Sequence, residues 1–335
     1  MRRLAARLLI AGCAMAVCAS AASCAAAPGR AVAQERTHPA AQEGTYPADS
    51  LSAPITARVP ASARSQIASG PVIDVVGAPQ GVQAKSGILV DATTGQVLWA
   101  QDENTVRPIA SITKVMTALV VIQAGGLNQQ VAVPAAVTGY IAQYGADAAG
   151  LIPGQTFTVD QLLHIMLVMS AADAAYALAN AYGPGLPAFI AKMNAEAAQL
   201  GLTHTHFTSP DGLPYPTETS TYSTPAELVR LGEIAMSYQE FRSIVGLHYY
   251  NLPKGDGHSA YSFTSSNELI GHYPGVIGIK TGFTDAAGHT LLFEAVRGNR
   301  TLIGDVLGSP ASGPAAGAID AAKVLTWGFS LKQST

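Results

Sequence analysis

The sequence predicts an α/β (α+β) fold in which strands from both ends of the chain form one sheet around an inserted, mostly helical subdomain. Strand-like runs rich in β-branched and apolar residues lie near the start and the end of the folded part: 87–92, 96–101, 275–284, 289–298 and 300–308. Thr93-Thr94-Gly95 joins the first two runs as a hairpin turn. The order of the elements predicts a mixed sheet whose first and last strands come together.

The intervening segments have helical spacing and end at residues that favour helix ends. Ser111 opens an apolar helix that ends at Gly125. Thr224 is the expected N-cap of a helix that has Pro225 at its first position. The remaining expected helices are 158–169, 172–183, 186–202 and 316–330.

The N-terminal segment indicates export. Three arginines precede a run of small apolar residues, and Ala31-Val32-Ala33 forms a signal-cleavage pattern. We predict a signal peptide over 1–33, a disordered Pro/Ala/Ser-rich tether over 34–78 and a folded domain over 79–330. The protein is therefore expected to be secreted or to act on the cell-wall or periplasmic side of the membrane.

Two other interpretations of the leader stay open. The apolar run could anchor the chain as a membrane span, although it is short and weakly hydrophobic. Alternatively, Cys13 or Cys24 could carry a lipid. All three cysteines precede residue 33, so a cleaved chain would contain no disulfide and no thiol.

Composition and charge exclude several classes of function. The chain is 48% hydrophobic and 12% charged, which is enough apolar material for a large core. Its formal net charge of −3 gives no indication of a basic surface for nucleic acid. His204 and His206 lack the further ligands in nearby sequence that a zinc site needs. We expect no metal and no cofactor.

The strongest local motif is Ser111-Ile112-Thr113-Lys114 at a helix start. A serine needs a base before it can act as a nucleophile, and a lysine three residues later projects from the same helical face. Burial would lower the pKa of that lysine and let it accept the serine proton. The pattern S-x-x-K is common by chance, so alone it identifies nothing.

The second motif is Lys280-Thr281-Gly282 within a predicted strand. There it offers a cation, a hydroxyl and backbone N–H groups along one edge of a cleft, and glycine lets a substrate backbone approach closely. Taken alone, the motif favours an ordinary strand with an edge lysine.

Together and in this order, the motifs resemble those of the penicillin-recognising serine D-alanyl-D-alanine carboxypeptidases, low-molecular-mass penicillin-binding proteins. The resemblance extends over about 80–330 and includes "ILVDATTGQVLWAQDENTVRPIASITKVMTALV", "MNAEAAQLGLTHTHFTSPDGL" and "GVIGIKTGFTDAAGHTLLFEAVRG". It implies a β-lactamase/transpeptidase-like fold with an antiparallel sheet. It also implies peptidoglycan stem peptides ending in D-Ala-D-Ala as substrates and β-lactams as covalent inhibitors.

The resemblance assigns a catalytic role to three residues. Ser111 would be the acylated nucleophile and Lys114 its base. Ser170 would relay the proton toward the leaving amine. The Ser111 N–H would also form half of the oxyanion hole.

The same resemblance assigns substrate binding to the strand motif. Lys280 and Thr281 would hold the terminal carboxylate of the substrate, and Gly282 would allow close approach. The backbone N–H of Phe283 would complete the oxyanion hole.

The chain departs from the family at the motif S-x-N, which here is Ser170-Ala171-Ala172. The absent amide normally donates to the amide carbonyl of the substrate and helps to fix the catalytic lysine, and one such hydrogen bond contributes about 1–3 kcal/mol. Asp173 or a water is a candidate for partial replacement. Ser266 also stands where some members carry an arginine near the substrate carboxylate.

Three functions therefore remain on the sequence alone. The first is a carboxypeptidase with reduced activity, and the second is a non-catalytic protein that binds stem peptides or β-lactams. The third is a β-lactamase, for which Glu218 and Glu227 are the acidic residues available between the second and third motifs.

Overall fold

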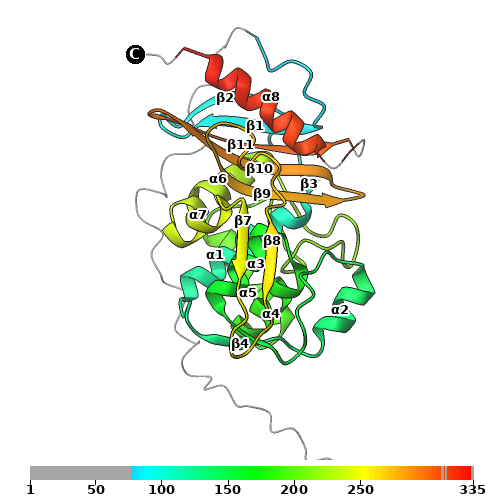
Figure 1. Cartoon of the computed structure of the whole chain (residues 1–335). Coiled ribbons are helices and arrows are strands. Elements are labelled where there is room, and N and C mark those ends of the chain that lie inside the picture. Colours follow the sequence, from blue (N-terminus) through cyan, green and yellow to red (C-terminus); the bar gives the residue numbers. More distant parts are fainter. Residues whose placement is uncertain (1–76, 311–312, 314, 333–335) are drawn as a thin grey trace, which may run out of the picture. The chain divides into compact units, whose positions relative to one another are not determined.

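Strands from both ends of the chain meet in one five-stranded sheet with the order β2-β1-β11-β10-β9 (Figure 1). The strands are β1 (Ser86–Asp91), β2 (Gln96–Gln101), β9 (Val276–Thr284), β10 (Gly288–Arg297) and β11 (Arg300–Ser309). Every neighbouring pair is antiparallel. The antiparallel sheet is confirmed and the mixed sheet is wrong. Short turns make β1–β2 and β9–β10–β11 antiparallel, and β1 also runs antiparallel to β11.

The structure is a computed structural model that describes residues 77–310, 313 and 315–332. These residues belong to one compact unit. The predicted signal peptide and the tether up to residue 76 lie outside the described residues. Within the described part, no helix is long and apolar enough to span a membrane.

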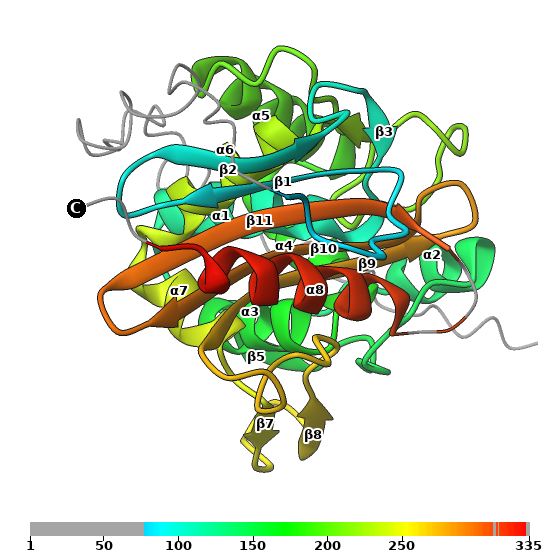
Figure 2. The ribbon, with the colours of Figure 1, turned by 90° about the horizontal axis from the view of Figure 1, so that it is seen from above.

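Helices cover both faces of the sheet (Figures 1 and 2). The last helix, α8 (Ala316–Ser330), packs on one face against β11 and β10, and the helical subdomain lies on the other. Its helices are α1 (Lys114–Ala124), α2 (Val137–Tyr144), α3 (Val159–Val168), α4 (Ala172–Tyr182), α5 (Leu186–Gln199), α6 (Pro225–Met236) and α7 (Gln239–Val245). Every helix predicted from the sequence is present, whereas α2 and α7 were not predicted.

Helix α6 approaches the sheet closely at Gly232. A Cβ atom placed on this glycine would lie 3.2–3.3 Å from side-chain atoms of Leu292, Ile279 and Ile303. The predicted cap is also confirmed, because the Thr224 hydroxyl accepts the backbone N–H of Glu227 at 3.2 Å. Helix α6 therefore packs directly against β9, β10 and β11.

Short strand pairs connect the longer elements. They are β3 (Arg107–Pro108) with β6 (Tyr222–Ser223), β4 (Gln130–Ala132) with β5 (Thr156–Thr158), and β7 (Tyr249–Leu252) with β8 (Tyr261–Thr264). The β7–β8 hairpin packs against α3. It returns the chain to Ser266, whose backbone N–H donates to the Val168 carbonyl at 2.8 Å.

The start of the nucleophile helix differs from the prediction. Residues Ala110–Thr113 form a 3₁₀ helix, and the α-helical part begins only at Lys114. Ala110 has a φ of 47°, and a Cβ atom on Gly212 would lie 1.8 Å from the Ala110 carbonyl oxygen. The turn that carries Ser111 is therefore held tightly against the loop around Gly212, which requires a glycine there.

Candidate active site

Ser111 and Lys114 form the central contact of the site. The Lys114 Nζ donates to the Ser111 Oγ at 2.8 Å and to the backbone carbonyl of Asp211 at 2.9 Å. Lys114 is 2% exposed, whereas Ser111 is partly exposed to solvent. The 3₁₀ turn places the two side chains on the same side of the helix start, as the S-x-x-K spacing predicts.

The environment of Lys114 favours its neutral form. Burial lowers the pKa of Lys114 to about 8, against the opposing effect of the carboxylates of Asp211, Asp147 and Asp173. A neutral amine that is hydrogen-bonded to a serine hydroxyl can take the proton of that hydroxyl. The pair can therefore perform nucleophilic catalysis.

The Lys-Thr-Gly motif lies on β9, at the edge of the sheet next to the 3₁₀ turn. Lys280 is 1% exposed, and its Nζ donates to the Thr281 carbonyl at 2.9 Å. Burial and the nearby charge of Lys114 both lower the pKa of Lys280 well below its usual range, whereas Asp147 raises it. An anionic group bound beside the buried Lys280 amine would favour its charged form.

Two further contacts tie β9 to its neighbours. A Cβ atom on Gly282 would lie 2.9 Å from the backbone nitrogen of Ser111, so only glycine lets the two segments approach this closely. The Thr281 hydroxyl lies 2.9 Å from the Ser266 hydroxyl. Phe283 is 47% exposed, and its ring lies 4.5 Å from the His289 ring, measured between centroids.

Ser170 lies at the junction between α3 and α4. Its φ of 72° is in the left-handed region, which is rare for a residue other than glycine and is often found at functional sites. Within the described residues its hydroxyl has no hydrogen bond to Ser111 or to Lys114. Its role as a proton relay therefore stays a prediction.

Asp173 does not take the place of the missing amide. Its carboxylate accepts the backbone N–H groups of Ala149, Leu151 and Ala174 at 2.9–3.1 Å, so its oxygens are occupied. Ala172 is 2% exposed, and its N–H donates to the Asp147 carbonyl at 2.9 Å. The second motif therefore packs against the loop that contains residues 147–151.

Sequence reasoning did not assign roles to Asp211 and Tyr140. The Tyr140 hydroxyl on α2 donates to the Asp211 carboxylate at 2.9 Å. The backbone carbonyl of Asp211 accepts a hydrogen bond from the Lys114 Nζ. Asp211 lies in the stretch that resembles the family, but a contact through a backbone carbonyl has no side-chain signature in the sequence.

Other candidate residues lie apart from this constellation. The Glu227 carboxylate accepts the His204 N–H at 2.9 Å and the Thr205 hydroxyl at 2.5 Å, so it supports local structure. Glu218 is exposed in a loop. Neither environment is that of a base activated for deacylation, and the described residues contain no cluster of metal ligands.

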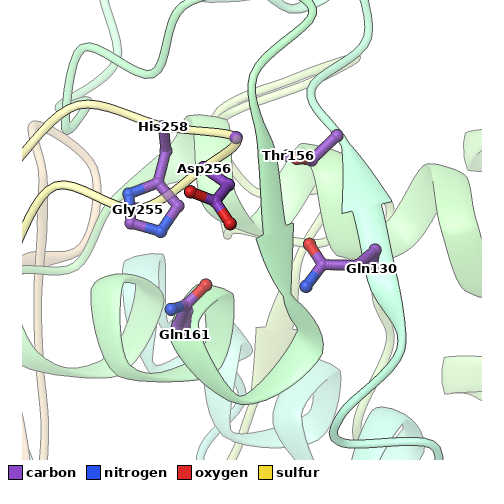
Figure 3. Close-up of a pocket in the computed structure, with 7 residues that line it drawn as sticks. Gln130, Thr156, Gln161, Gly255, Asp256 and His258 are labelled. Carbon is purple, nitrogen blue, oxygen red and sulfur yellow. The ribbon is translucent and has the colours of Figure 1, made fainter.

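A polar pocket lies at the tip of the β7–β8 hairpin (Figure 3). Figure 3 shows Asp256 and His258 on the hairpin loop and Gln161 on the first turn of α3. The lining residues are Gln130, Thr156, Gln161, Gly255, Asp256, Gly257 and His258. None of them belongs to the site predicted from the motifs.

The fold and the Ser-Lys pair define a serine acyl-transfer protein, and the comparisons agree. The D-alanyl-D-alanine carboxypeptidase family profile matches residues 74–311. A D-alanyl-D-alanine carboxypeptidase of Streptomyces sp. strain K15 is 37% identical over 75% of this chain and 88% of the relative. D-alanyl-D-alanine carboxypeptidase DacB2 of Mycobacterium tuberculosis is 38% identical over 74% of this chain and 83% of the relative. The crystal structure of the Streptomyces K15 DD-transpeptidase matches with a TM-score of 0.69 and 34% identity over 79% of this chain and 100% of that one. The chain belongs to the D-alanyl-D-alanine carboxypeptidase family.

Proposed function

We propose that the protein is an exported serine-type D-alanyl-D-alanine carboxypeptidase that trims peptidoglycan stem peptides. The observation that carries the proposal is the 2.8 Å hydrogen bond between the Lys114 Nζ and the Ser111 Oγ. Burial of Lys114 supports it, because a pKa of about 8 leaves a useful fraction of neutral base at neutral pH. No metal or cofactor is needed for this chemistry.

Acylation starts when the Ser111 Oγ attacks the carbonyl carbon between the two D-alanines. Lys114 takes the hydroxyl proton as the new C–O bond forms. The C–N bond then breaks, and the terminal D-Ala leaves as an amine after it receives a proton through Ser170. Water next attacks the ester on Ser111, which releases the shortened peptide and restores the serine hydroxyl.

The other motif residues would bind and polarise the substrate. Lys280 and Thr281 lie on the edge strand beside Ser111 and would hold the terminal carboxylate. Backbone N–H groups of Ser111 and Phe283 would stabilise the oxyanion, and each such donor typically contributes 10²–10³ in rate. A β-lactam would enter by the same route and leave a stable acyl group on Ser111.

The missing amide lowers the expected rate without removing the nucleophile. Ala172 cannot donate to the substrate, and the loss of one hydrogen bond of this kind slows acylation roughly ten- to hundredfold. The predicted signal peptide would export the domain to the side of the membrane where peptidoglycan lies. We therefore propose a slow carboxypeptidase rather than an inert binding protein.

The purified folded domain can be incubated with a synthetic pentapeptide ending in D-Ala-D-Ala and, separately, with a fluorescent penicillin. We expect D-Ala release and a stable label, both absent in Ser111→Ala. A label without D-Ala release would indicate the non-catalytic binding protein. Rapid turnover of the penicillin would indicate a β-lactamase, and the absence of both label and D-Ala would refute the acyl-enzyme.

A further inference from the structure

Two hydrogen bonds fix the direction of the Lys114 amine. One goes to the Ser111 Oγ at 2.8 Å, and the other goes to the backbone carbonyl of Asp211 at 2.9 Å. Both Lys114 and Asp211 are buried. The position of the Asp211 backbone therefore affects whether the amine points at the serine hydroxyl.

Asp211 lies in the middle of a turn formed by residues 209–213. On one side of it, the Thr117 hydroxyl on α1 donates to the carbonyl of Pro210 at 2.5 Å. On the other side, the Gly212 N–H donates at 2.9 Å to the hydroxyl of the serine that opens the turn. Both neighbours of Asp211 are thus held, and the contacts of its own side chain complete the turn.

Among the described residues, the Asp211 carboxylate has one hydrogen-bond partner outside this turn. Its Oδ1 accepts the Leu213 N–H at 3.2 Å, within the turn, and its Oδ2 accepts the Tyr140 hydroxyl at 2.9 Å. It forms no ion pair with any residue that the structure describes. A buried carboxylate is costly unless hydrogen bonds satisfy it, so the Tyr140 hydroxyl determines where this side chain lies.

Tyr140 is itself held by two aromatic neighbours. Its ring centroid lies 5.2 Å from that of Tyr144 on the same helix and 4.8 Å from that of Tyr176 on α4. Burial and the adjacent Asp211 raise the pKa of Tyr140 above its usual range, so the phenol keeps its proton and remains a donor. The contact to Asp211 therefore comes from a fixed group on α2.

We propose that Tyr140 is a positioning residue that acts through Asp211 on the direction of the Lys114 amine. The hydrogen bonds form one chain, in which the Tyr140 hydroxyl holds the Asp211 carboxylate and the Asp211 carbonyl holds the amine beside Ser111. The inference rests on the proposed function, in which Lys114 takes the proton of Ser111. Helix α2, which carries no motif, is thereby linked to the proton transfer.

Tyr140→Phe removes the first link of this chain and keeps the aromatic ring. The Asp211 carboxylate then loses its donor from α2, the turn shifts, and the amine is directed at Ser111 for less of the time. Because misplacing a catalytic group by about 1 Å can cost about 10²-fold in rate, a smaller shift should lower the limiting rate of acylation roughly tenfold. The affinity for the unreacted inhibitor should not change, because the residues proposed to bind it lie on β9.

The test measures acylation by a fluorescent penicillin at several concentrations, which separates the limiting rate from the dissociation constant of the initial complex. Tyr144→Phe is the matched control, because it removes a phenol hydroxyl from the same helix that accepts from the Gln143 amide at 3.1 Å instead. We expect a lower limiting rate in Tyr140→Phe alone, with an unchanged dissociation constant and an unchanged labelled fraction. A wild-type limiting rate, an equal fall in the control, or a loss confined to the labelled fraction would overturn the proposal.

A double variant keeps the test decisive if the unpartnered buried carboxylate prevents Tyr140→Phe from folding. Tyr140→Phe/Asp211→Asn removes the buried charge and keeps an acceptor for the Leu213 N–H, but it does not restore the link to α2. We expect this protein to fold and to react as slowly as predicted for Tyr140→Phe. Acylation at the wild-type rate would contradict the role of Tyr140.

A ¹³C NMR measurement separates this inference from the proposed function. The Lys114 Cε signal, assigned by its absence in Lys114→Arg, should shift in Tyr140→Phe and not in Tyr144→Phe, whether or not the penicillin reacts. An unchanged signal in Tyr140→Phe would refute the role of Tyr140. If the wild type forms no acyl-enzyme, the proposed function fails independently of that signal.

Discussion

Asp305 provides a quantitative test of how the sheet is built. It lies on β11, the central strand, opposite Ile88 on β1 and Leu292 on β10. The residue is 0% exposed, and neither carboxylate oxygen has a hydrogen-bond partner within the described part of the chain. Burial raises the pKa of Asp305 well above its usual range, so the folded state favours the neutral acid.

The sign of the pH dependence follows from this raised pKa. The unfolded chain releases the Asp305 proton near pH 4, whereas the folded protein retains it to a higher pH. The stability that the neutral acid preserves at low pH is therefore lost as the pH rises toward the folded pKa. Between the unfolded and the folded pKa, the slope of this loss is at most about 1.4 kcal/mol per pH unit.

The perturbation is Asp305→Val, with Asp305→Asn as the matched control. At pH 5 valine removes an unsatisfied buried polar group, which should raise the free energy of unfolding by about 1–3 kcal/mol. Asparagine keeps the polar atoms, so it should remove the pH dependence without that gain. Burial also raises the pKa values of Glu233 and Glu294. Because the variants differ only at residue 305, the difference between their free energies of unfolding contains the contribution of Asp305 alone.

Urea denaturation at pH 5, 6, 7 and 8 measures these differences directly. The free energy of unfolding of Asp305→Val should exceed that of the wild type by a margin that widens with pH. Each 1 kcal/mol corresponds to about 2–4 °C in Tm for a domain of this size. Parallel pH curves for the two proteins, or a less stable valine variant at every pH, would refute the reasoning.

Three further predictions concern the site. Ala172→Asn should accelerate D-Ala release roughly ten- to hundredfold by restoring one hydrogen bond, and an unchanged or lower rate would count against the alignment of this motif. The acylation rate of the wild type should rise about tenfold per pH unit up to a pH of about 8 and then level off, because protonated Lys114 cannot accept the serine proton. A flat profile would exclude Lys114 as the base. Gly282→Ala should abolish penicillin labelling while the far-UV circular dichroism is retained, since its Cβ would lie 2.9 Å from the Ser111 nitrogen, and normal labelling would contradict this packing.

The long elements of the fold were predictable because their local patterns are strong. The three strands after residue 275 have continuous apolar runs, and the helix at 316–330 matches α8 without any shift. Helices α2 and α7 have only 8 and 7 residues, which is too short for a clear helical period. The 3₁₀ turn at Ala110–Thr113 depends on contact with a loop about 100 residues later, which local propensity cannot encode.

The site shows the same division between local and long-range information. The spacing of Ser111 and Lys114 predicted their contact, and the pattern around Lys280 predicted that this residue lies on a strand. Asp147 carries no motif, because its relation to Ala172 is a backbone hydrogen bond between separate loops and helices. Such contacts appear only when the whole chain is folded.

The central claim is that Ser111 is a nucleophile activated by Lys114. The most direct test is intact-protein mass spectrometry after incubation with benzylpenicillin, followed by peptide mapping. Our account predicts one added acyl group, located on Ser111, that is absent in Ser111→Ala and forms much more slowly in Lys114→Ala. An unmodified mass in the wild type, or an acyl group on any other residue, would contradict it.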